Sequence, residues 1–348
     1  MRVGLLTGGG DCPGLNAVIR AVTKSLISQS QAEVIGIEDG FLGLIEGRTR
    51  PLDWRAVSGI AAAGGTVLGT TNRVNPLASP ETTRAALTHA ANLGLEALVA
   101  IGGDGTMTVA HGQAELGLPC VGVPKTIDND IAGTERSFGF DTAVAIIAEG
   151  LDRVQTTAQS HGRVMIVETM GRNAGWLALE AGIAGGADVI LLPEIDHDVD
   201  AVAARCRERE QRQRFTVICI AEGAKARGGQ QTVAQRVADS HEQVRLGGVA
   251  HVLRERLQMM VATEVRATVL GHVQRGGAPT AFDRVLATQF GNEAALRVEQ
   301  RRFNEMVTLV NGAFGSVPLA AVAGRTRRVA ADHPLLRCAE QIGICLGR

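Results

Sequence analysis

The fold of this chain is indicated by the stretch ALVAIGGDGT, residues 97–106, in which an apolar run ends abruptly at glycine and aspartate. Short runs rich in Val, Ile and Leu, without alternation, are typical of buried parallel strands. Runs of the same kind, each ending at glycine, proline or an acidic residue, occur at Val3–Thr7, Cys120–Val123, Val164–Val167, Val189–Leu192, Phe215–Ala221 and Ala267–Leu270.

Helical patterns lie between these runs. In residues 141–158 the apolar side chains recur every three or four positions, and Asp141 is the expected N-cap. A second helical run covers residues 15–28. Alternation of strands and helices predicts α/β layers with parallel sheets, and ligands in such sheets bind beyond the carboxyl ends of the strands. A length of 348 residues suggests about two domains, at ~150 residues per domain.

Composition excludes several classes of function. Lys+Arg 35 against Asp+Glu 36 give a net charge of −1, which argues against a general electrostatic grip on nucleic acid or anionic membranes. With 8 Phe, 2 Trp and no Tyr, a base-stacking surface is also disfavoured. The six cysteines include no C-x-x-C pair, and Cys120 and Cys219 are expected to be buried thiols. Without an 18-residue apolar stretch or a signal peptide, we expect a cytoplasmic protein.

Two glycine-rich loops follow predicted strands. The first, GGGDCPG at residues 8–14, precedes a helix and suits a phosphate, although a plain glycine turn explains it equally well. The second, GGDGT at residues 102–106, sets the single carboxylate of Asp104 among glycines, as Mg²⁺ beside phosphate oxygens requires. A turn aspartate is the alternative, and GGDGT also occurs in NAD and diacylglycerol kinases, so this loop indicates only phosphoryl transfer from a nucleotide.

The segment PKTIDND, residues 124–130, is more specific. It sets two carboxylates two residues apart, with a lysine and a threonine, directly after a strand. An aspartate here can accept the proton of an attacking hydroxyl. With Met170-Gly171-Arg172, Glu222-Gly223 and the run RATVLGHVQRGG at residues 266–277, the chain resembles the phosphofructokinase family from residue 4 to about residue 284.

The resemblance implies a donor site and a catalytic group. Gly10 and the loop of Gly103, Asp104, Gly105 and Thr106 resemble the donor-phosphate site, with Mg²⁺ at Asp104. Asp128 resembles the general base for the 1-hydroxyl of fructose 6-phosphate, with Thr126 and Ile127 in the same substrate-binding segment and Asp130 a neighbouring carboxylate. Arg172 resembles the cation that stabilises the transferred phosphoryl group.

The resemblance also implies an acceptor site. Met170, Gly171 and Arg172 resemble the sugar-contacting segment, and Glu222 a ligand of the sugar hydroxyls. The 6-phosphate cluster is Arg163, Arg266, His272 and Arg275, with Val273 and Gln274 in the same substrate-binding run. Arg163 and Arg266 are expected to reach the site of a neighbouring subunit in a homodimer or homotetramer. Each member of this cluster also has an alternative role that involves no ligand. An arginine could form a surface ion pair, and His272 could be an interior histidine whose hydrogen bonds are made within the protein.

Donor identity depends on three positions. Arg73 is the candidate for the adenine-side arginine, although its match is offset. Lys125 is typical of pyrophosphate-using relatives, whereas Gly105 is typical of ATP-using ones. Because glycine leaves room for the α-phosphate, the resemblance together with Gly105 implies an ATP-dependent 6-phosphofructokinase of glycolysis. One alternative is the pyrophosphate-dependent phosphotransferase. Another is a catalytically silent regulatory subunit, which a turnover assay would distinguish from an enzyme. A third is a NAD or lipid kinase, but such a kinase needs neither the TIDND nor the HVQRGG segment.

The resemblance implies two Rossmann-like parallel-sheet domains with the active site in the cleft between them. Residues 1–138 plus 275–327 are expected to form the donor (ATP/Mg) domain. Residues 139–274 plus 328–348 are expected to form the fructose 6-phosphate domain.

Overall fold

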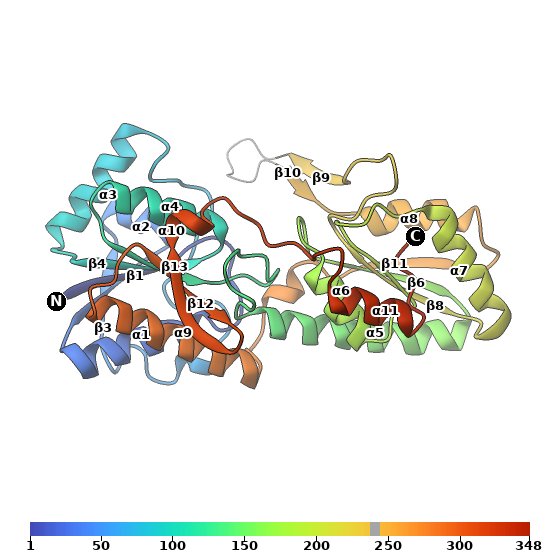
Figure 1. Cartoon of the computed structure of the whole chain (residues 1–348), viewed down its shortest axis with the longest axis horizontal. Helices are drawn as coiled ribbons and strands as arrows, with labels where there is room; N and C mark the ends of the chain where they lie inside the picture. Colours follow the sequence, from blue (N-terminus) through green and yellow to red (C-terminus); the bar gives the residue numbers. More distant parts are fainter. Residues whose placement is uncertain (237–243) are drawn as a thin grey trace.

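The computed structural model describes residues 1–236 and 244–348, which form two α/β lobes (Figure 1). The first lobe is built on a seven-stranded sheet of order β13-β12-β5-β4-β1-β2-β3. Its strands are β1 (Arg2–Thr7), β2 (Glu33–Ile37), β3 (Thr49–Leu52), β4 (Ala97–Gly102), β5 (Cys120–Pro124), β12 (Glu305–Val310) and β13 (Ala313–Pro318). Its helices are α1 (Leu15–Ser30), α2 (Phe41–Glu46), η1 (Ile60–Ala62), α3 (Pro80–Asn92), α4 (Asp104–Glu115), α9 (Ala281–Glu299) and α10 (Leu319–Val322).

The edges of this sheet differ from the expected all-parallel arrangement. β1, β2, β4, β5 and β12 are parallel, but β3 and β13 pair antiparallel with their neighbours. The connection explains β13: Asn311 (φ 52°) and Gly312 (φ 73°) make a two-residue hairpin turn that only residues tolerant of positive φ adopt easily. A loop of two residues leaves no room for the crossover that a parallel pair needs.

The second lobe holds a four-stranded parallel sheet of order β11-β6-β8-β7 and the separate hairpin β9–β10. Its strands are β6 (Val164–Thr169), β7 (Val189–Leu191), β8 (Thr216–Ala221) and β11 (Val265–Val269), and the hairpin is β9 (Val233–Arg236) with β10 (Val244–Leu246). Its helices are α5 (Phe140–His161), α6 (Trp176–Ala184), α7 (Val199–Arg212), α8 (Val249–Gln258), η2 (Gly271–Arg275) and α11 (Pro334–Gln341).

The chain crosses between the lobes more than once. After η2 it returns to the first lobe, where α9 packs against α1. After α10 it crosses again, so that α11 packs on α6 and Cys345 pairs with Val189 at the edge of β7 (Figure 1). Each lobe is therefore built from two segments that are far apart in the sequence.

The helix over residues 141–158 is confirmed as α5, but the expectation that Asp141 is its N-cap is wrong. Gly139 is the N-cap, with φ 92°. Glycine is needed at this position because a Cβ there would lie 2.6 Å from Cys12 Sγ. Asp141 lies in the first turn, where its negative charge interacts favourably with the positive end of the helix dipole. Its carboxylate accepts a 2.6 Å hydrogen bond from Thr280 Oγ1.

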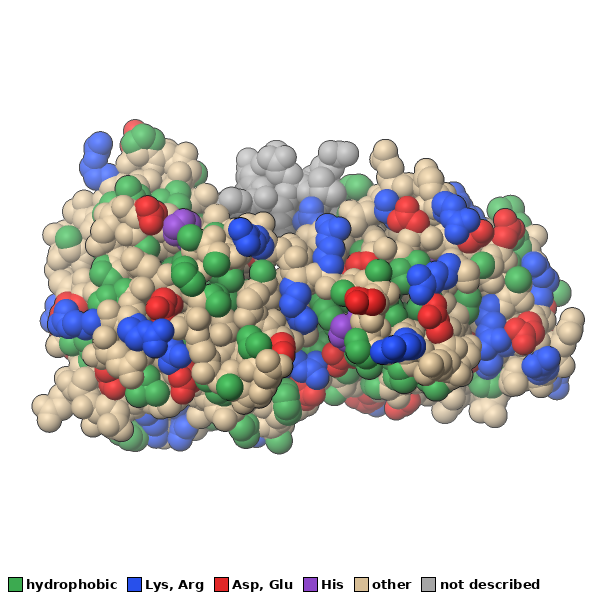
Figure 2. Space-filling model, in the orientation of Figure 1, with side chains coloured by type: hydrophobic (Ala, Val, Ile, Leu, Met, Phe, Trp, Pro, Cys, Tyr) green, Lys and Arg blue, Asp and Glu red, His purple; other side chains and the backbone are tan. Residues whose placement is uncertain are grey.

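Burial follows the apolar runs. The seven predicted strands are all present, and Cys120 and Cys219 are fully buried as expected. On the face shown in Figure 2, basic and acidic side chains are interspersed over both lobes, in keeping with the near-zero net charge. No helix in the described part of the chain is long and apolar enough to cross a membrane.

Candidate active site

The loop of residues 8–14 joins β1 to α1 and is held by neighbouring backbone and side chains. Gly8 N donates to the Ile101 carbonyl at 2.9 Å, and Thr70 Oγ1 donates to the Gly9 carbonyl at 2.6 Å. The buried amine of Lys125 donates to the Gly10 carbonyl. Burial lowers the pKa of this amine, and Asp11 and Asp128 oppose that shift. The Lys125 side chain is thus buried against the loop and bonded to its backbone, and does not extend into solvent.

The GGDGT loop lies beside it, where β4 ends and α4 begins. Gly103 is the N-cap and offers no capping side chain, so the first N–H groups of α4 are available to an anion. A Cβ at Gly102 would lie 2.2 Å from Thr106 Oγ1, whereas a Cβ at Gly105 meets nothing within 4 Å. Glycine is therefore required for packing at 102, but faces open space at 105.

The segment of residues 124–130 follows β5 and turns at Asn129, whose φ is 53°. Asp128 N donates to Thr126 Oγ1 at 3.1 Å. The side-chain amide of Asn129 accepts a hydrogen bond from Ser137 N and donates one to the Glu135 carbonyl. Burial raises the pKa of Asp130 to about 7, with Asp128 and Asp104 adding to the shift and a hydrogen bond with Thr126 opposing it. The Asp130 carboxyl is therefore close enough to Asp128 and to Asp104 to be affected by both charges.

The acceptor-side segments meet at the carboxyl ends of β6, β8 and β11. Glu222 N donates to the Thr169 carbonyl at 2.8 Å, and Gly223 N to the Gly171 carbonyl at 3.2 Å. Gly171 has a φ of 117°, and a Cβ at Gly223 would lie 2.0 Å from the Arg172 carbonyl oxygen. Small residues are thus needed where the MGR and EG segments touch.

Glu222 combines burial with charged neighbours of both signs. Burial raises its pKa to about 8, and the Asp128 and Glu168 carboxylates contribute, while Arg275 and Arg172 oppose them. The Glu222 carboxyl thus lies close to the expected catalytic base of the other lobe and to two of the expected phosphate-binding arginines.

Arg275 connects the two lobes at this point. Its Nη1 donates to the Asp11 carbonyl at 3.2 Å, and a Cβ on Gly10 would lie 2.8 Å from the same nitrogen. Nearby, a Cβ on Gly64 would lie 2.3 Å from the Gly277 carbonyl oxygen. The HVQRGG run is therefore packed against the donor loop.

Arg163 and Arg266 lie elsewhere in this chain. Arg163 immediately precedes β6, and Arg266 pairs with Met165 near the start of β11, so both occupy the amino edge of the sheet. Both contact Glu264, Arg163 through Nε at 2.5 Å. At ~3.3 Å per residue, the six residues of β6 separate that edge from Met170 by about 20 Å. The structure does not bring these two arginines to the chain's own candidate site.

The remaining predicted residues differ in exposure. His272 and Arg73 are exposed, and Val273 is 60% exposed. Gln274 is fully buried, accepts a hydrogen bond from Met170 N at 3.1 Å and donates to the Gly271 carbonyl at 3.0 Å. Its side chain thus holds the start of the segment that is expected to contact the sugar. Ile127 is likewise fully buried, so any ligand contact there would use its backbone.

The carboxylate pattern fits Mg²⁺ held partly by a ligand. In the described part of the chain, no group of three or more His, Cys, Asp or Glu side chains has the spacing of an all-protein metal cage. Mg²⁺ commonly uses one or two carboxylates and completes its shell with phosphate oxygens and water. Burial raises the pKa of Asp130, and repulsion from Asp128 and Asp104 adds to the shift; a cation beside Asp104 would relieve that repulsion.

Three residues that hold loops of the candidate site are not predicted from the sequence. Asn16, on α1, donates to the carbonyls of Ala63 and Gly64 and accepts from Val67 N, which fixes the loop against Gly277. The buried carboxylate of Glu168 accepts from Gly248 N and Ala250 N at the start of α8. Gln231 donates to the Arg172 carbonyl at 3.1 Å. A polar residue inside an apolar pattern is the only signal that could have singled out Asn16.

Comparison with known proteins identifies the family that the chain resembles. The sequence model described as Phosphofructokinase matches residues 2–298. The chain is 48% identical to pyrophosphate–fructose 6-phosphate 1-phosphotransferase of Streptomyces coelicolor, over 100% of both chains. It is 47% identical to the ATP-dependent 6-phosphofructokinase of Chloroflexus aurantiacus, over 99% of this chain and 98% of that one.

A solved structure of phosphofructokinase from Saccharomyces cerevisiae superposes with a TM-score of 0.80 and 32% identity, covering 92% of this chain and 45% of that chain. The chain therefore belongs to the phosphofructokinase family of phosphotransferases.

Proposed function

We propose that this protein is an ATP-dependent 6-phosphofructokinase, which converts fructose 6-phosphate and MgATP to fructose 1,6-bisphosphate and ADP. The observation that carries the choice of donor is the open space at Gly105, in the first turn of α4 beside Asp104. ATP differs from pyrophosphate in its α-phosphate and nucleoside, so its donor site needs room just beyond the first two phosphates. Glycine supplies this room and presents its N–H.

The reaction needs one proton transfer and one displacement. Asp128 accepts the proton of the 1-hydroxyl, and the resulting oxygen attacks the γ-phosphorus of ATP. The bond between the γ-phosphorus and the β,γ-bridging oxygen breaks, and ADP leaves with its electron pair. Since little covalent work is left to the protein, positioning and charge neutralisation supply most of the acceleration. Arg172 supplies positive charge to the transferred group.

Several groups support this arrangement. Gly10, Gly103 and Thr106 surround the donor phosphates, Arg73 lies on the adenine side, and Asp104 is the residue that would hold Mg²⁺. When bound, Mg²⁺ would neutralise charge on the donor's phosphate oxygens. Thr126, Met170, Gly171 and Glu222 hold the sugar. His272 and Arg275 hold its 6-phosphate, which the guanidinium of Arg275 can bind through two parallel N–H donors.

Subunit contacts complete the acceptor site in this proposal. Arg163 and Arg266, at the amino edge of the second sheet, reach the 6-phosphate of a neighbouring subunit. Their paired position around Glu264, about 20 Å from their own site, supports this reading. The donor domain then comprises residues 1–138 plus 275–327, and the acceptor domain 139–274 plus 328–348.

The second candidate is the pyrophosphate-dependent phosphotransferase. Lys125 favours it, because a buried ammonium beside the donor loop would stabilise a pyrophosphate that has no adenosine to anchor it. A relative of that name is 48% identical to this chain. Lysine at 125 is compatible with either donor, because its amine is already engaged with the Gly10 carbonyl.

Turnover with ATP and with pyrophosphate, measured side by side with fructose 6-phosphate and Mg²⁺, tests the proposal. We expect the kcat/KM for ATP to exceed that for pyrophosphate. A tenfold preference for pyrophosphate would overturn the donor assignment. Failure with both donors, in protein that remains folded, would overturn the activity itself.

A further inference from the structure

The last crossing between the lobes passes directly behind the turn that carries Asp128. Residues 323–333 leave α10 in the first lobe and reach α11 in the second (Figure 1). On the way, Thr326 forms an antiparallel bridge with Ile131, and Arg327 N donates to the Asp130 carbonyl at 2.7 Å. The crossing segment is thus paired with the backbone that follows the catalytic turn.

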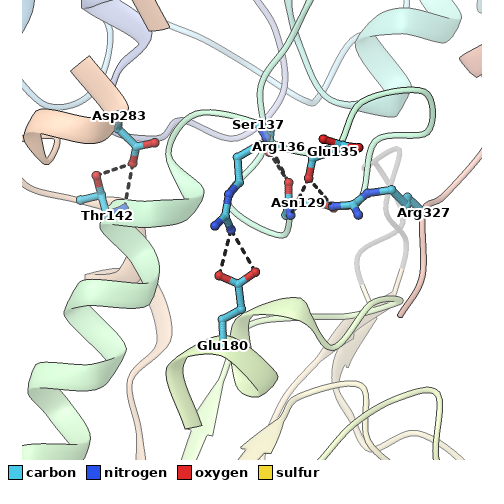
Figure 3. A network of polar contacts seen from close by, with 8 residues as sticks. All are labelled: Asn129, Glu135, Arg136, Ser137, Thr142, Glu180, Asp283 and Arg327. Atoms are coloured by element: carbon cyan, nitrogen blue, oxygen red, sulfur yellow. Dashed lines mark hydrogen bonds and ion pairs between the residues drawn. The ribbon is translucent and has the colours of Figure 1, made fainter. Parts of the chain in front are cut away.

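The Arg327 side chain adds two bonds to the same turn. Its Nη2 donates to the carbonyls of Asn129, at 2.7 Å, and Glu135, at 2.9 Å. Figure 3 shows the Arg327 guanidinium beside Asn129 and Glu135. The left-handed backbone at Asn129 directs its carbonyl to this guanidinium, while Asp128 and Asp130 flank it in sequence. Arg327 therefore fixes the main chain of the turn.

The other contacts of Arg327 belong to the acceptor lobe. Its guanidinium lies 4.2 Å from the ring centroid of Trp176, the first residue of α6, and Trp176 Nε1 donates to the Arg327 carbonyl at 3.1 Å. Trp176 is 3% exposed and packs edge-on against His333 of the same crossing segment. α6 directly follows the loop of Met170, Gly171 and Arg172.

A second link runs parallel to the first. Arg136, just beyond the turn, forms a two-bond ion pair with Glu180 of α6, at 2.8 and 2.9 Å (Figure 3). Glu194 accepts from both Gly175 N and Val329 N, which ties the crossing segment to the residue before α6. The start of α6 and the catalytic turn are therefore held together by polar contacts on both sides of Arg327.

We propose that Arg327 is a positioning residue that sets Asp128 in register with the Arg172 loop, by clamping the carbonyls of the turn while stacking on Trp176. This inference rests on the proposed function, since it concerns the same reaction. Because a 1 Å misplacement of a reacting group can cost about 100-fold, loss of the clamp should act mainly on kcat.

The test compares Arg327→Met with Arg328→Met, the same change at the adjacent exposed arginine. We expect Arg327→Met to lower kcat about 10- to 100-fold, with the KM of each substrate within threefold, and Arg328→Met to keep at least half of the activity. Arg327→Lys keeps the charge but not the planar fork, so it should restore only part of kcat.

A double-mutant cycle separates positioning from general destabilisation. If Arg327 acts through Asp128, then Arg327→Met should cost less than threefold in kcat in an Asp128→Ala background. Equal losses in both backgrounds, equal losses from Arg327→Met and Arg328→Met, or an Arg327→Met enzyme with more than half of the wild-type kcat would overturn the inference. If Arg327→Met fails to fold, the same cycle is run with Arg327→Lys. Wild-type enzyme inactive with both donors would instead refute the proposed function.

Discussion

Arg275 Nη1 donates a 3.2 Å hydrogen bond to the carbonyl oxygen of Asp11, and so joins two loops that are 264 residues apart in the sequence. The same guanidinium opposes the raised pKa of Glu222. One side chain thus contacts the donor loop of one lobe and acts on the acceptor site of the other.

This contact predicts that Arg275→Ala weakens both substrates. Loss of a guanidinium–phosphate interaction should raise the KM of fructose 6-phosphate by more than tenfold. Loss of the Asp11 contact should also raise the KM of ATP, by a few-fold. His272→Ala is the matched control, because His272 belongs to the same run and should affect fructose 6-phosphate alone. An unchanged ATP KM in Arg275→Ala would show that the Asp11 contact does not shape the donor site.

Asp128→Asn should collapse turnover while leaving the affinities of both substrates within roughly tenfold. A general base contributes about 10²–10⁴-fold, and it acts mainly in the transition state. Steady-state kcat and KM values measure this, with the exposed Asp152→Asn as a control for handling of the protein. A variant that keeps more than a third of the wild-type kcat would exclude Asp128 as the base.

Gly105→Asp should abolish use of ATP without unfolding the protein. The new side chain enters open space and lies at a helix N-terminus, where a carboxylate is favourable. It would nevertheless fill the room for the α-phosphate and repel it, by a few kcal/mol at ~4 Å and intermediate dielectric.

Gly105→Asn, of nearly equal size, separates the two effects. We expect kcat/KM for ATP to fall in both variants and to fall further with aspartate, while weak use of pyrophosphate appears. Full ATP activity in Gly105→Asp would contradict the proposed donor site.

Shared sites predict complementation between inactive variants. Arg163→Ala together with Arg266→Ala should raise the KM of fructose 6-phosphate, although both residues lie about 20 Å from the site of their own chain. Mixing this double variant with Asp128→Asn and allowing subunits to exchange should restore activity, because some sites then receive an intact base from one chain and intact arginines from the other. Activity that stays unchanged on dilution to a monomer, checked by sedimentation, would refute sharing.

Glu222 predicts a pH-dependent difference in stability. Its pKa is raised from the model-compound 4.5 to about 8 by burial, so the folded protein keeps it neutral where the unfolded chain ionises it. The contribution of Glu222 to the free energy of unfolding is therefore greatest below pH 4.5 and decreases as the pH rises to about 8, because the unfolded chain can ionise the carboxyl and the folded protein cannot. Glu222→Gln should avoid this loss and gain about 1–3 kcal/mol at pH 9, with little difference at pH 4.5.

Urea unfolding without substrates at pH 4.5, 7 and 9 measures this, with the exposed Glu115→Gln as control. A Glu222→Gln protein that is no more stable than wild type at pH 9 would show that the carboxyl is not buried in this way.

The sequence by itself determined the strands and the loops that follow them, because apolar runs and the glycines after them are local signals. ALVAIGGDGT predicts a strand and a helix start, and the structure has β4 followed by α4 at Asp104. The antiparallel edges were not foreseen, although Asn311-Gly312 is a local hairpin signal. The sequence predicts Asp141 as the N-cap of α5, whereas the structure has Gly139 there, because the packing of Gly139 against Cys12 depends on a distant segment.

Only the tertiary structure decided which residues face one another. Nothing local in the sequence pairs Arg275 with Asp11, or Arg327 with Asn129, because these contacts depend on how two sheets and the crossing segments are placed. The same holds for Arg163 and Arg266, which share a motif set with Arg275 but lie at the opposite edge of the sheet. Periodicity reports which face of an element is buried, whereas the partner on that face is fixed by packing across the whole chain.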